Sequence, residues 1–349
     1  MKGEILLRVG VLGLGNMGKL HLMNAMRIKG ISVVAAADKS ERSRKFAEKY
    51  HVKTYDDYRT LIDKEDLDAV IISLPNFLKK ESVVYAAEHD LDVFLDKPLA
   101  RSSNEAKEIV HEVENKKVRL MVGVNYRYFD SVQKLKKRLD DGEIGDVIIA
   151  TSELILNGPF SHHLVPTPVP DWWLNKKMAG GGALLDLGYH LIDIFTWMFG
   201  DFHLEYSGLG YRLNLPVEDA ATVVLGSERT STKCIVNVGW FSKSVFPGFN
   251  FRVNIHGTVG YDSTDRYAPK NPHIYAVKEG VLNFLRKISL RKINYLSYTY
   301  YYSSFYKILE VFFDAIKYGA EFPVSLEGQL EVTRIIDEAY RRHDVVINE

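Results

Sequence analysis

Apolar and polar positions follow an alternating pattern over the first third of the chain. Short apolar runs, which predict buried strands, occur at residues 5–12, 31–37, 69–74, 93–95 and 120–124. Helical spacing of apolar residues lies between them, at residues 17–29, 56–62, 80–88 and 104–115. Because strands that alternate with helices usually pair in parallel, the pattern predicts an α/β domain with a doubly wound parallel sheet.

The pattern changes after Arg127. Helical spacing at 132–139, 184–198 and 302–318 is combined with strand-like alternation at 147–156, 221–225, 233–238 and 251–255. The regular strand–helix alternation is absent, so we expect an α+β domain built on a sheet of antiparallel character. A length of 349 residues suits two domains, which we place at residues 1–124 and 125–349.

Composition narrows the class of protein. Lys plus Arg and Asp plus Glu each number 45, and this neutrality argues against nucleic acid as the main partner. The single cysteine, Cys234, excludes an internal disulfide framework and a cysteine-based zinc finger. We expect Cys234 to be a small buried apolar residue, and the protein to be cytoplasmic.

Hydropathy gives no sign of a membrane partner. The sequence has no run of about 20 apolar residues, so we expect no membrane-spanning helix. We also expect no signal peptide, because Arg8 interrupts the first apolar run and glycine-rich sequence follows it.

A glycine-rich turn joins the first predicted strand to the first predicted helix. Its residues are Gly13, Leu14, Gly15, Asn16, Met17 and Gly18. In a G-x-G-x-x-G turn between strand and helix, the first glycine permits the tight turn and the second lets the backbone approach a pyrophosphate. The third allows close packing of helix and strand. The turn therefore predicts dinucleotide binding, with a glycine turn that holds no ligand as the alternative.

Asp38 ends the next predicted strand, 20 residues after Gly18. An acidic residue at this position can accept hydrogen bonds from the ribose hydroxyls of the adenosine, which favours NAD(H). Lys39, Ser40 and Arg42 follow directly and could accept a 2′-phosphate, so NADP(H) remains an alternative.

Ligands of doubly wound sheets bind at the carboxyl ends of the strands. The residues at these ends, which we predict to contact the cofactor, are Leu74, Asn76, Asp96, Lys97 and Asn125. Lys97 precedes a proline that favours an extended backbone, and its amine can reach a ribose or a substrate hydroxyl. A surface lysine in a turn is the competing interpretation. Arg127 is a weaker candidate, for contact with a substrate.

Three polar residues interrupt the apolar helix predicted at 184–198. Asp186, His190 and Asp193 are spaced i, i+4 and i+7, on one helical face. Asp186 could orient His190 as a general base. The alternatives are a hydrogen-bonded core histidine, a solvated helix face, or a metal pair completed by His162 or His163. We expect no metal.

Residues 157–174 form a predicted loop with four prolines. Long loops with aromatic residues often cover binding sites, so His163 and Trp173 are weaker candidates for substrate contact. A rigid surface excursion is the alternative.

Residues 264–300 are locally basic, with seven Lys or Arg against Asp265 and Glu279, and six tyrosines lie between 295 and 306. Such a segment could be a nucleic-acid or membrane patch. The neutrality of the whole chain favours a variable segment that leads into a packed helix, with the tyrosines at an oligomer or domain contact.

The ordered motifs resemble those of the glucose–fructose oxidoreductase / inositol dehydrogenase / rhizopine-catabolism (Gfo/Idh/MocA) family over nearly the full chain. They are Asp96-Lys97-Pro98, Asn125-Tyr126-Arg127, Gly181 to His190, Val217-Glu218-Asp219 and Phe322-Pro323-Val324-Ser325. Two positions depart from the family pattern: Asp96 replaces the usual Glu of Glu-Lys-Pro, and Lys79 stands where many members have His.

The resemblance implies a Rossmann domain followed by a domain with a large, mostly antiparallel sheet. The open face of that sheet would form a homodimer or homotetramer contact. By position, Lys97, Asp186 and His190 match the family's catalytic residues. The implied reaction is hydride transfer between a nicotinamide cofactor and a secondary alcohol of a sugar, polyol or nucleotide sugar. Two alternatives are an NAD-dependent, redox-neutral glycosidase of the same fold and a non-catalytic dinucleotide-binding regulator.

Overall fold

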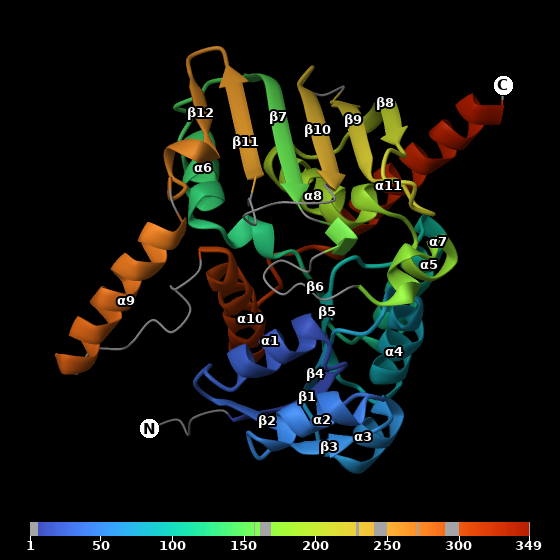
Figure 1. Ribbon diagram of the computed structural model, residues 1–349, viewed down its shortest axis with the longest axis vertical. Coiled ribbons are helices and arrows are strands. Elements are labelled where there is room, and N and C mark those ends of the chain that lie inside the picture. The colour runs from blue at the N-terminus through green and yellow to red at the C-terminus, as the bar shows by residue number, and fades with distance from the viewer. Residues whose placement is uncertain are drawn as a thin grey trace.

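The computed structural model describes residues 6–156, 158–160, 169–227, 230–240, 250–270, 272–289 and 300–348. The strands in these ranges form two six-stranded sheets. The first sheet, β1 to β6, is built from the N-terminal part of the chain, and the second, β7 to β12, lies at the opposite end of the molecule (Figure 1).

The first sheet is entirely parallel, with the strand order β3-β2-β1-β4-β5-β6. Its strands are β1 (Leu7–Leu12), β2 (Ile31–Ala37), β3 (Lys53–Tyr55), β4 (Ala69–Ile72), β5 (Asp92–Asp96) and β6 (Leu120–Gly123). The helices between them are α1 (Asn16–Ala25), α2 (Glu41–Glu48), α3 (Tyr58–Lys64), α4 (Asn76–Glu88) and α5 (Ser103–Lys116). Every residue of β4 and β6 is buried, as expected for strands covered on both faces. The predicted doubly wound sheet is confirmed.

The second sheet is mostly antiparallel, with the strand order β12-β11-β7-β10-β9-β8. Only β7 and β10 pair in parallel. Its strands are β7 (Val147–Leu156), β8 (His203–Gly210), β9 (Ala220–Gly226), β10 (Lys233–Trp240), β11 (Asn250–Gly257) and β12 (Tyr261–Ser263). The expected α+β character of this part of the chain is confirmed.

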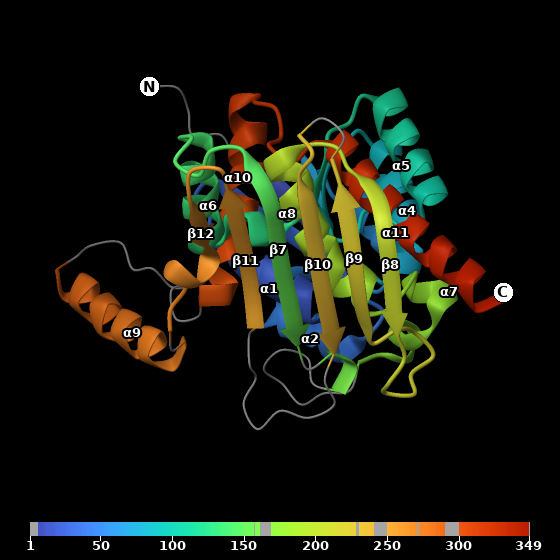
Figure 2. The ribbon, with the colours of Figure 1, turned by 90° about the horizontal axis from the view of Figure 1, so that it is seen from above.

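One face of the second sheet is buried and the other is open. Along β10, Cys234, Val236 and Val238 are buried, whereas Ile235 and Asn237 between them are partly exposed. Helix α8 (Tyr189–Phe199) packs against the buried face, and no described element covers the opposite face (Figure 2). Cys234 is thus a buried apolar residue, as predicted, and burial raises the pKa of its thiol.

The remaining described helices other than α8 all follow β6 in the chain. They are α6 (Asp130–Asp140), α7 (Lys176–Ala179), α9 (Pro272–Ile288), α10 (Tyr300–Tyr318) and α11 (Leu326–Asn348). Short 3₁₀ turns lie at Asn125–Tyr128, Gly158–Phe160, Asp171–Leu174 and Thr264–Arg266. Across the described ranges, no helix is both long and apolar enough to cross a bilayer.

Helices α10 and α11 return to the first sheet. Helix α10 packs against α1 and β6, and α11 packs against α5, α8 and β8. The predicted domain division at 124/125 falls directly after β6, but these two helices contact both sides of it.

Candidate active site

A cavity of about 720 Å³ lies at the carboxyl ends of the strands of the first sheet. The predicted site residues that line it are Gly13, Gly15, Asn16, Met17, Asp38, Leu74, Asn76, Asp96, Lys97, Asn125, Trp173, Asp186 and His190. Gly18 and Arg127 do not line it, and His163 lies outside the described residues. Both halves of the chain therefore contribute to one site.

The glycine turn has the geometry that a pyrophosphate requires. A Cβ on Gly18 would lie 1.8 Å from the carbonyl oxygen of Gly13, so only glycine allows this packing. A Cβ on Gly15 would meet no atom within 4 Å, which shows that the space above the turn is open. Helix α1 begins at the next residue without a side-chain cap, so its first N–H groups are available to an anion.

Asp38 is fixed at the edge of the cavity by the backbone. Its Oδ2 accepts the N–H of Leu14 at 2.7 Å, and its Oδ1 accepts the N–H of Ser40 at 2.8 Å. Each carboxylate oxygen retains a further lone pair for a ribose hydroxyl. Ser40 and Arg42, the residues that could accept a 2′-phosphate, also line the cavity.

Some residues of the cavity wall carry buried polar atoms that make no hydrogen bond within the described residues. Among the described residues, Oδ1 of Asn125 and Oγ of Ser73 have no hydrogen-bond partner. The Nδ2 of Asn125 donates to Oγ of Ser304 at 2.8 Å, which fixes the amide and leaves its oxygen available. A nicotinamide carboxamide carries N–H donors, so these atoms fit the cofactor that the glycine turn predicts.

Lys97 and Asp186 are brought together from opposite halves of the chain. Lys97 follows β5, and its Nζ donates to both the Oδ1 and the backbone oxygen of Asp186, each at 2.7 Å. Both side chains are about one fifth exposed, at 19% and 22%, and both line the cavity. An ammonium group held in this way can donate to the oxygen of a bound hydroxyl compound.

His190 lies on the same cavity wall with its ring orientation fixed. Its ring stacks on Tyr126 with a centroid separation of 4.0 Å and an interplanar angle of 26°. Tyr126 itself packs edge-on against Phe129 and Phe251. The imidazole is 5% exposed, so an edge of the ring can meet a ligand while its plane cannot turn freely.

The predicted helix 184–198 is not wholly α-helical, and its three polar residues lie in two different environments. Residues 184–188 form a π-turn, and α8 begins only at Tyr189. Asp186 and His190 reach the cavity, but Asp193 is fully buried. The three residues therefore do not share one functional face, because Asp193 lies one turn beyond His190 on α8 and its carboxylate is paired with Arg127.

Arg127 and Asp193 form a buried ion pair in place of a substrate contact. Arg127 Nε donates to Asp193 Oδ2 at 2.7 Å, and its second amino nitrogen donates to Oδ1 at 2.6 Å. Gln329 of α11 also donates to Asp193 Oδ1, at 2.6 Å. A two-point contact of this kind is strong and specific, so Asp193 holds the guanidinium in the buried core.

Trp173 is placed at the cavity as predicted. It belongs to the 3₁₀ turn Asp171–Leu174 and stacks on Trp240 at the end of β10, with ring centroids 5.5 Å apart. Both rings line the cavity. Residues 157 and 161–168 of the predicted loop, which include His162 and His163, lie outside the described ranges. Within those ranges, no three metal-ligating side chains gather in one place.

Glu218 supports the turn that carries Asp186. Its carboxylate accepts the N–H groups of Gly182 and Leu184 and the hydroxyl of Tyr340 in α11. Burial raises the pKa of Glu218, although these hydrogen bonds oppose the shift. The motif Val217-Glu218-Asp219 is recognisable in the sequence, but nothing there indicates that its carboxylate meets a turn more than 30 residues earlier.

Lys79 fixes the backbone of the loop that contains Lys97. It is buried, and its Nζ donates to three successive carbonyl oxygens: Asp96 at 2.6 Å, Lys97 at 2.6 Å and Pro98 at 3.2 Å. Three N–H donors of an ammonium match three acceptors. Burial lowers the pKa of Lys79 to about 7, although the carboxylates of Asp96 and Glu105 oppose the shift.

Asp96 lies close to three basic side chains. Its Oδ1 is 4.0 Å from Nε2 of His21, which is itself buried. Burial alone would raise the pKa of Asp96, but His21, Lys79 and Lys97 outweigh it and the pKa lies below its ordinary value. The shorter Asp at this position therefore remains a carboxylate.

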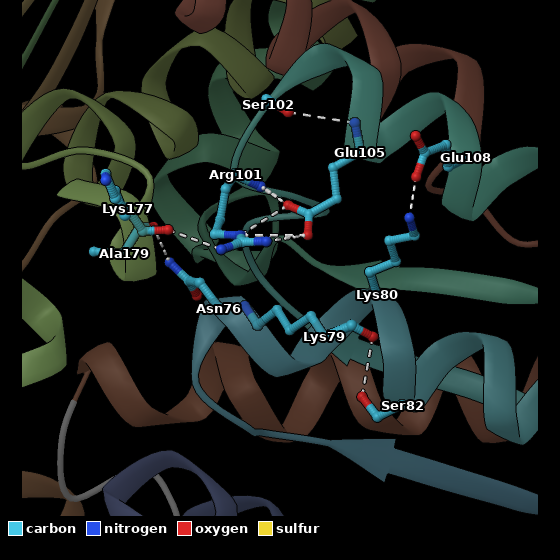
Figure 3. A network of polar contacts seen from close by, with 10 residues as sticks. All are labelled: Asn76, Lys79, Lys80, Ser82, Arg101, Ser102, Glu105, Glu108, Lys177 and Ala179. Atoms are coloured by element: carbon cyan, nitrogen blue, oxygen red, sulfur yellow. Dashed lines mark hydrogen bonds and ion pairs between the residues drawn. The ribbon is translucent and has the colours of Figure 1, made fainter. Parts of the chain in front are cut away.

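A polar network on α4 and α5 ties the cofactor side of the cavity to α7 (Figure 3). Asn76 Nδ2 donates to the carbonyl oxygen of Ala179 at 2.7 Å. Arg101 is ion-paired with Glu105 and also donates to the carbonyl oxygen of Lys177 at 2.8 Å. The network fixes α7 directly before the glycines that lead to Asp186.

Comparison with known proteins agrees with this geometry. Residues 7–124 match the family model for the oxidoreductase family with an NAD-binding Rossmann fold, and residues 132–261 match the GFO/IDH/MocA C-terminal domain. The chain is 26% identical to the uncharacterized oxidoreductase YrbE of Bacillus subtilis, over 93% of this chain and 91% of that protein. It is 28% identical to a myo-inositol 2-dehydrogenase of Thermotoga maritima, over 73% and 74% of the two chains.

Solved structures share the fold. The scyllo-inositol dehydrogenase of Lactobacillus casei, solved with NAD(H) and scyllo-inositol, superimposes with a TM-score of 0.78 at 19% identity. The match covers 97% of this chain and 98% of that one. The myo-inositol 2-dehydrogenase of Lactobacillus plantarum has a TM-score of 0.79 at 20% identity, over 97% and 98%.

Proposed function

The chain belongs to the GFO/IDH/MocA family of oxidoreductases with an NAD-binding Rossmann domain, and from this premise we propose that it is a dehydrogenase of a cyclic polyol or sugar. The observation that carries the proposal is the meeting of Lys97, Asp186 and His190 on the wall of one cavity with the glycine turn. A secondary alcohol bound there would lie between an ammonium donor and an imidazole.

The residues of the cavity divide into cofactor and substrate groups. The glycine turn and Asp38 would hold the dinucleotide, with Asn125 and Ser73 available to its carboxamide. We assign NAD(H) over NADP(H), because a 2′-phosphate would meet the carboxylate of Asp38. When bound, the nicotinamide ring supplies the acceptor or donor of the hydride.

Three side chains would then act on the substrate hydroxyl, by transferring its proton and stabilising the negative charge that develops on its oxygen. A ring nitrogen of His190 takes the proton of the substrate hydroxyl during oxidation and returns it during reduction. Lys97 donates a hydrogen bond to the same oxygen and stabilises the negative charge that develops on it. Asp186 holds the Lys97 ammonium in place through the 2.7 Å contact. Trp173 and Trp240 offer flat apolar surfaces to the carbon skeleton of a ring.

The relatives support a substrate with several ring hydroxyls. Two of them are named levoglucosan dehydrogenase and glucose-6-phosphate 3-dehydrogenase, and others inositol 2-dehydrogenase. We also propose a cytoplasmic protein that forms a homodimer or homotetramer through the open face of the second sheet (Figure 2).

The test is a cofactor-reduction screen with NAD and NADP against inositols, sugars and nucleotide sugars. We expect His190→Ala and Lys97→Ala each to lower kcat by at least about a hundredfold, because each removes a group that acts on the reacting oxygen. Binding of NADH, followed by its fluorescence, should change little. Near-normal turnover in both variants would overturn the proposal. Consumption of a glycoside without net NADH formation would instead identify the redox-neutral glycosidase.

A further inference from the structure

Helix α9 projects from the body of the molecule. In both ribbon views it stands apart from the two sheets (Figures 1 and 2). Large apolar side chains are exposed along it, with exposed fractions between 53% and 69%. They are Ile274, Val277, Val281, Phe284, Leu285 and Ile288.

These six residues form one continuous stripe. Counted from Ile274, they lie at i, i+3, i+7, i+10, i+11 and i+14, the spacing that in most globular proteins faces the core. At 3.6 residues per turn they occupy an arc of roughly 100°. None of them belongs to the hydrophobic core formed by the described residues. An apolar stripe of this size facing water indicates an interaction surface.

The helix that carries the stripe has a positive balance of charge. Between residues 272 and 288 the sequence contains Lys278, Arg286 and Lys287 against one acidic residue, Glu279. Lys278 is exposed and, seven residues before Leu285, lies at the border of the stripe. The chain as a whole is neutral, so this positive charge is local.

We propose that α9 lies flat on an anionic lipid surface. The apolar stripe would enter the boundary between headgroups and acyl chains, and the basic residues would contact lipid phosphates. An amphipathic helix with basic residues and Phe, Leu, Ile and Val on one face has the chemistry of such interfacial helices. The chain would lie on the bilayer without spanning it.

Charge favours a lipid surface over a second copy of the chain. A two-fold contact between copies would place the same basic surface against itself, where like charges repel. An anionic bilayer offers charge of the opposite sign.

The test is co-sedimentation of the full chain with large unilamellar vesicles. We compare pure phosphatidylcholine with a mixture containing roughly one third phosphatidylglycerol, an anionic lipid. We expect binding to the anionic vesicles, with an affinity that falls at high salt because the attraction of charges is screened. A wild-type protein that stays in the supernatant with anionic vesicles would overturn the proposal, as would equal, salt-independent binding to both kinds of vesicle.

Variants separate the stripe from other exposed apolar residues. Val277→Asp combined with Phe284→Asp should weaken binding to anionic vesicles by more than about tenfold, since two charged groups would have to enter the interface. Val259→Asp is the matched control, because Val259 is 77% exposed in the turn between β11 and β12, and it should bind as the wild type does. Thermal unfolding by circular dichroism checks that each variant is folded.

Lys278→Glu provides a milder variant with the stripe intact. It should weaken binding to the anionic vesicles and leave the small background with neutral vesicles unchanged. Light scattering after gel filtration gives the molar mass in solution. If the Asp double variant changes the molar mass of the protein and leaves vesicle binding unaltered, the stripe is a contact between copies and the proposal is wrong.

Discussion

Lys79 and Lys80 are neighbours on α4 with opposite environments. Lys79 is buried under the loop that carries Lys97, whereas Lys80 is exposed and pairs with Glu108 (Figure 3). The pKa of Lys79 is lowered to about 7 from 10.5. Between these values the unfolded chain binds one proton more than the folded chain, so stability rises with pH across this window.

This linkage can be measured with one substitution. We expect the free energy of unfolding of the wild type, relative to Lys79→Met, to increase from neutral pH towards pH 10.5, by an amount on the order of a few kcal/mol. Urea titrations at several pH values provide the measurement. Lys80→Met is the control for the loss of one lysine from the same helix. Parallel pH profiles for Lys79→Met and the wild type would contradict the prediction.

Asp38 is the residue on which cofactor choice depends. Its replacement by Ser removes the charge that a 2′-phosphate would meet and leaves Ser40 and Arg42 in the cavity wall. We expect the ratio of the Kd of NADPH to that of NADH to fall by at least about tenfold in Asp38→Ser. Fluorescence titration with both dinucleotides gives the ratio. An unchanged ratio would show that Asp38 does not meet the ribose.

Gly15 and Gly182 have different surroundings, so we expect their replacement by alanine to have different effects. At Gly15 a Cβ would enter open space, whereas at Gly182 it would lie 2.1 Å from the carbonyl oxygen of Glu218. We expect Gly182→Ala to lower the free energy of unfolding by more than about 2 kcal/mol, because the backbone of the π-turn must move. Gly15→Ala should change stability by less than about 1 kcal/mol.

Dinucleotide binding should respond in the opposite order. Gly15→Ala places a methyl group where the pyrophosphate approaches, so we expect NADH affinity to fall by more than about tenfold. Urea unfolding and NADH titration of both variants check the pair of predictions together. An unchanged free energy of unfolding in Gly182→Ala would contradict the first prediction. Normal NADH binding by Gly15→Ala would contradict the second.

At the level of elements, the sequence predicted what depends on local periodicity. The strands β2, β4 and β7 and the helix α5 follow directly from runs or spacing of apolar residues. The π-turn at 184–188 could not be predicted in this way, because one additional residue in a turn leaves no periodic signal. The exposed stripe of α9 and the helix α11 were also not predicted.

The candidate site could also be predicted from the sequence only in part. Lys97, Asp186 and His190 were each singled out from the sequence, and all three line the cavity. The pairing of Lys97 with Asp186 joins residues 89 positions apart, so it is a product of the tertiary fold. Arg127 was expected at the substrate because it follows a strand end, and only the buried carboxylate of Asp193 explains why it points elsewhere.

For the whole molecule, the open sheet face is the surface to test. Ile235 lies on the exposed side of β10 near the middle of the sheet. If copies of the chain meet there, Ile235→Arg would bury an unpaired charge in each copy, so we expect it to shift the protein to monomers. Light scattering after gel filtration measures the molar mass, and Val259→Asp serves as a surface control. Equal molar masses for Ile235→Arg and the wild type would assign the contact to another surface.

The hydrogen bond from Tyr340 to Glu218 has a consequence for synthesis on the ribosome. The glycine turn, Lys97 and His190 all leave the exit tunnel before α11 is made. The first sheet and its phosphate-binding turn are therefore synthesised before the helix α11 that packs against α5 and β6. Until Tyr340 emerges, Glu218 and the backbone N–H of Leu185 lack its hydroxyl. A nascent chain can therefore complete its dinucleotide-binding turn early, whereas the turn that carries Asp186 is completed only when α11 docks.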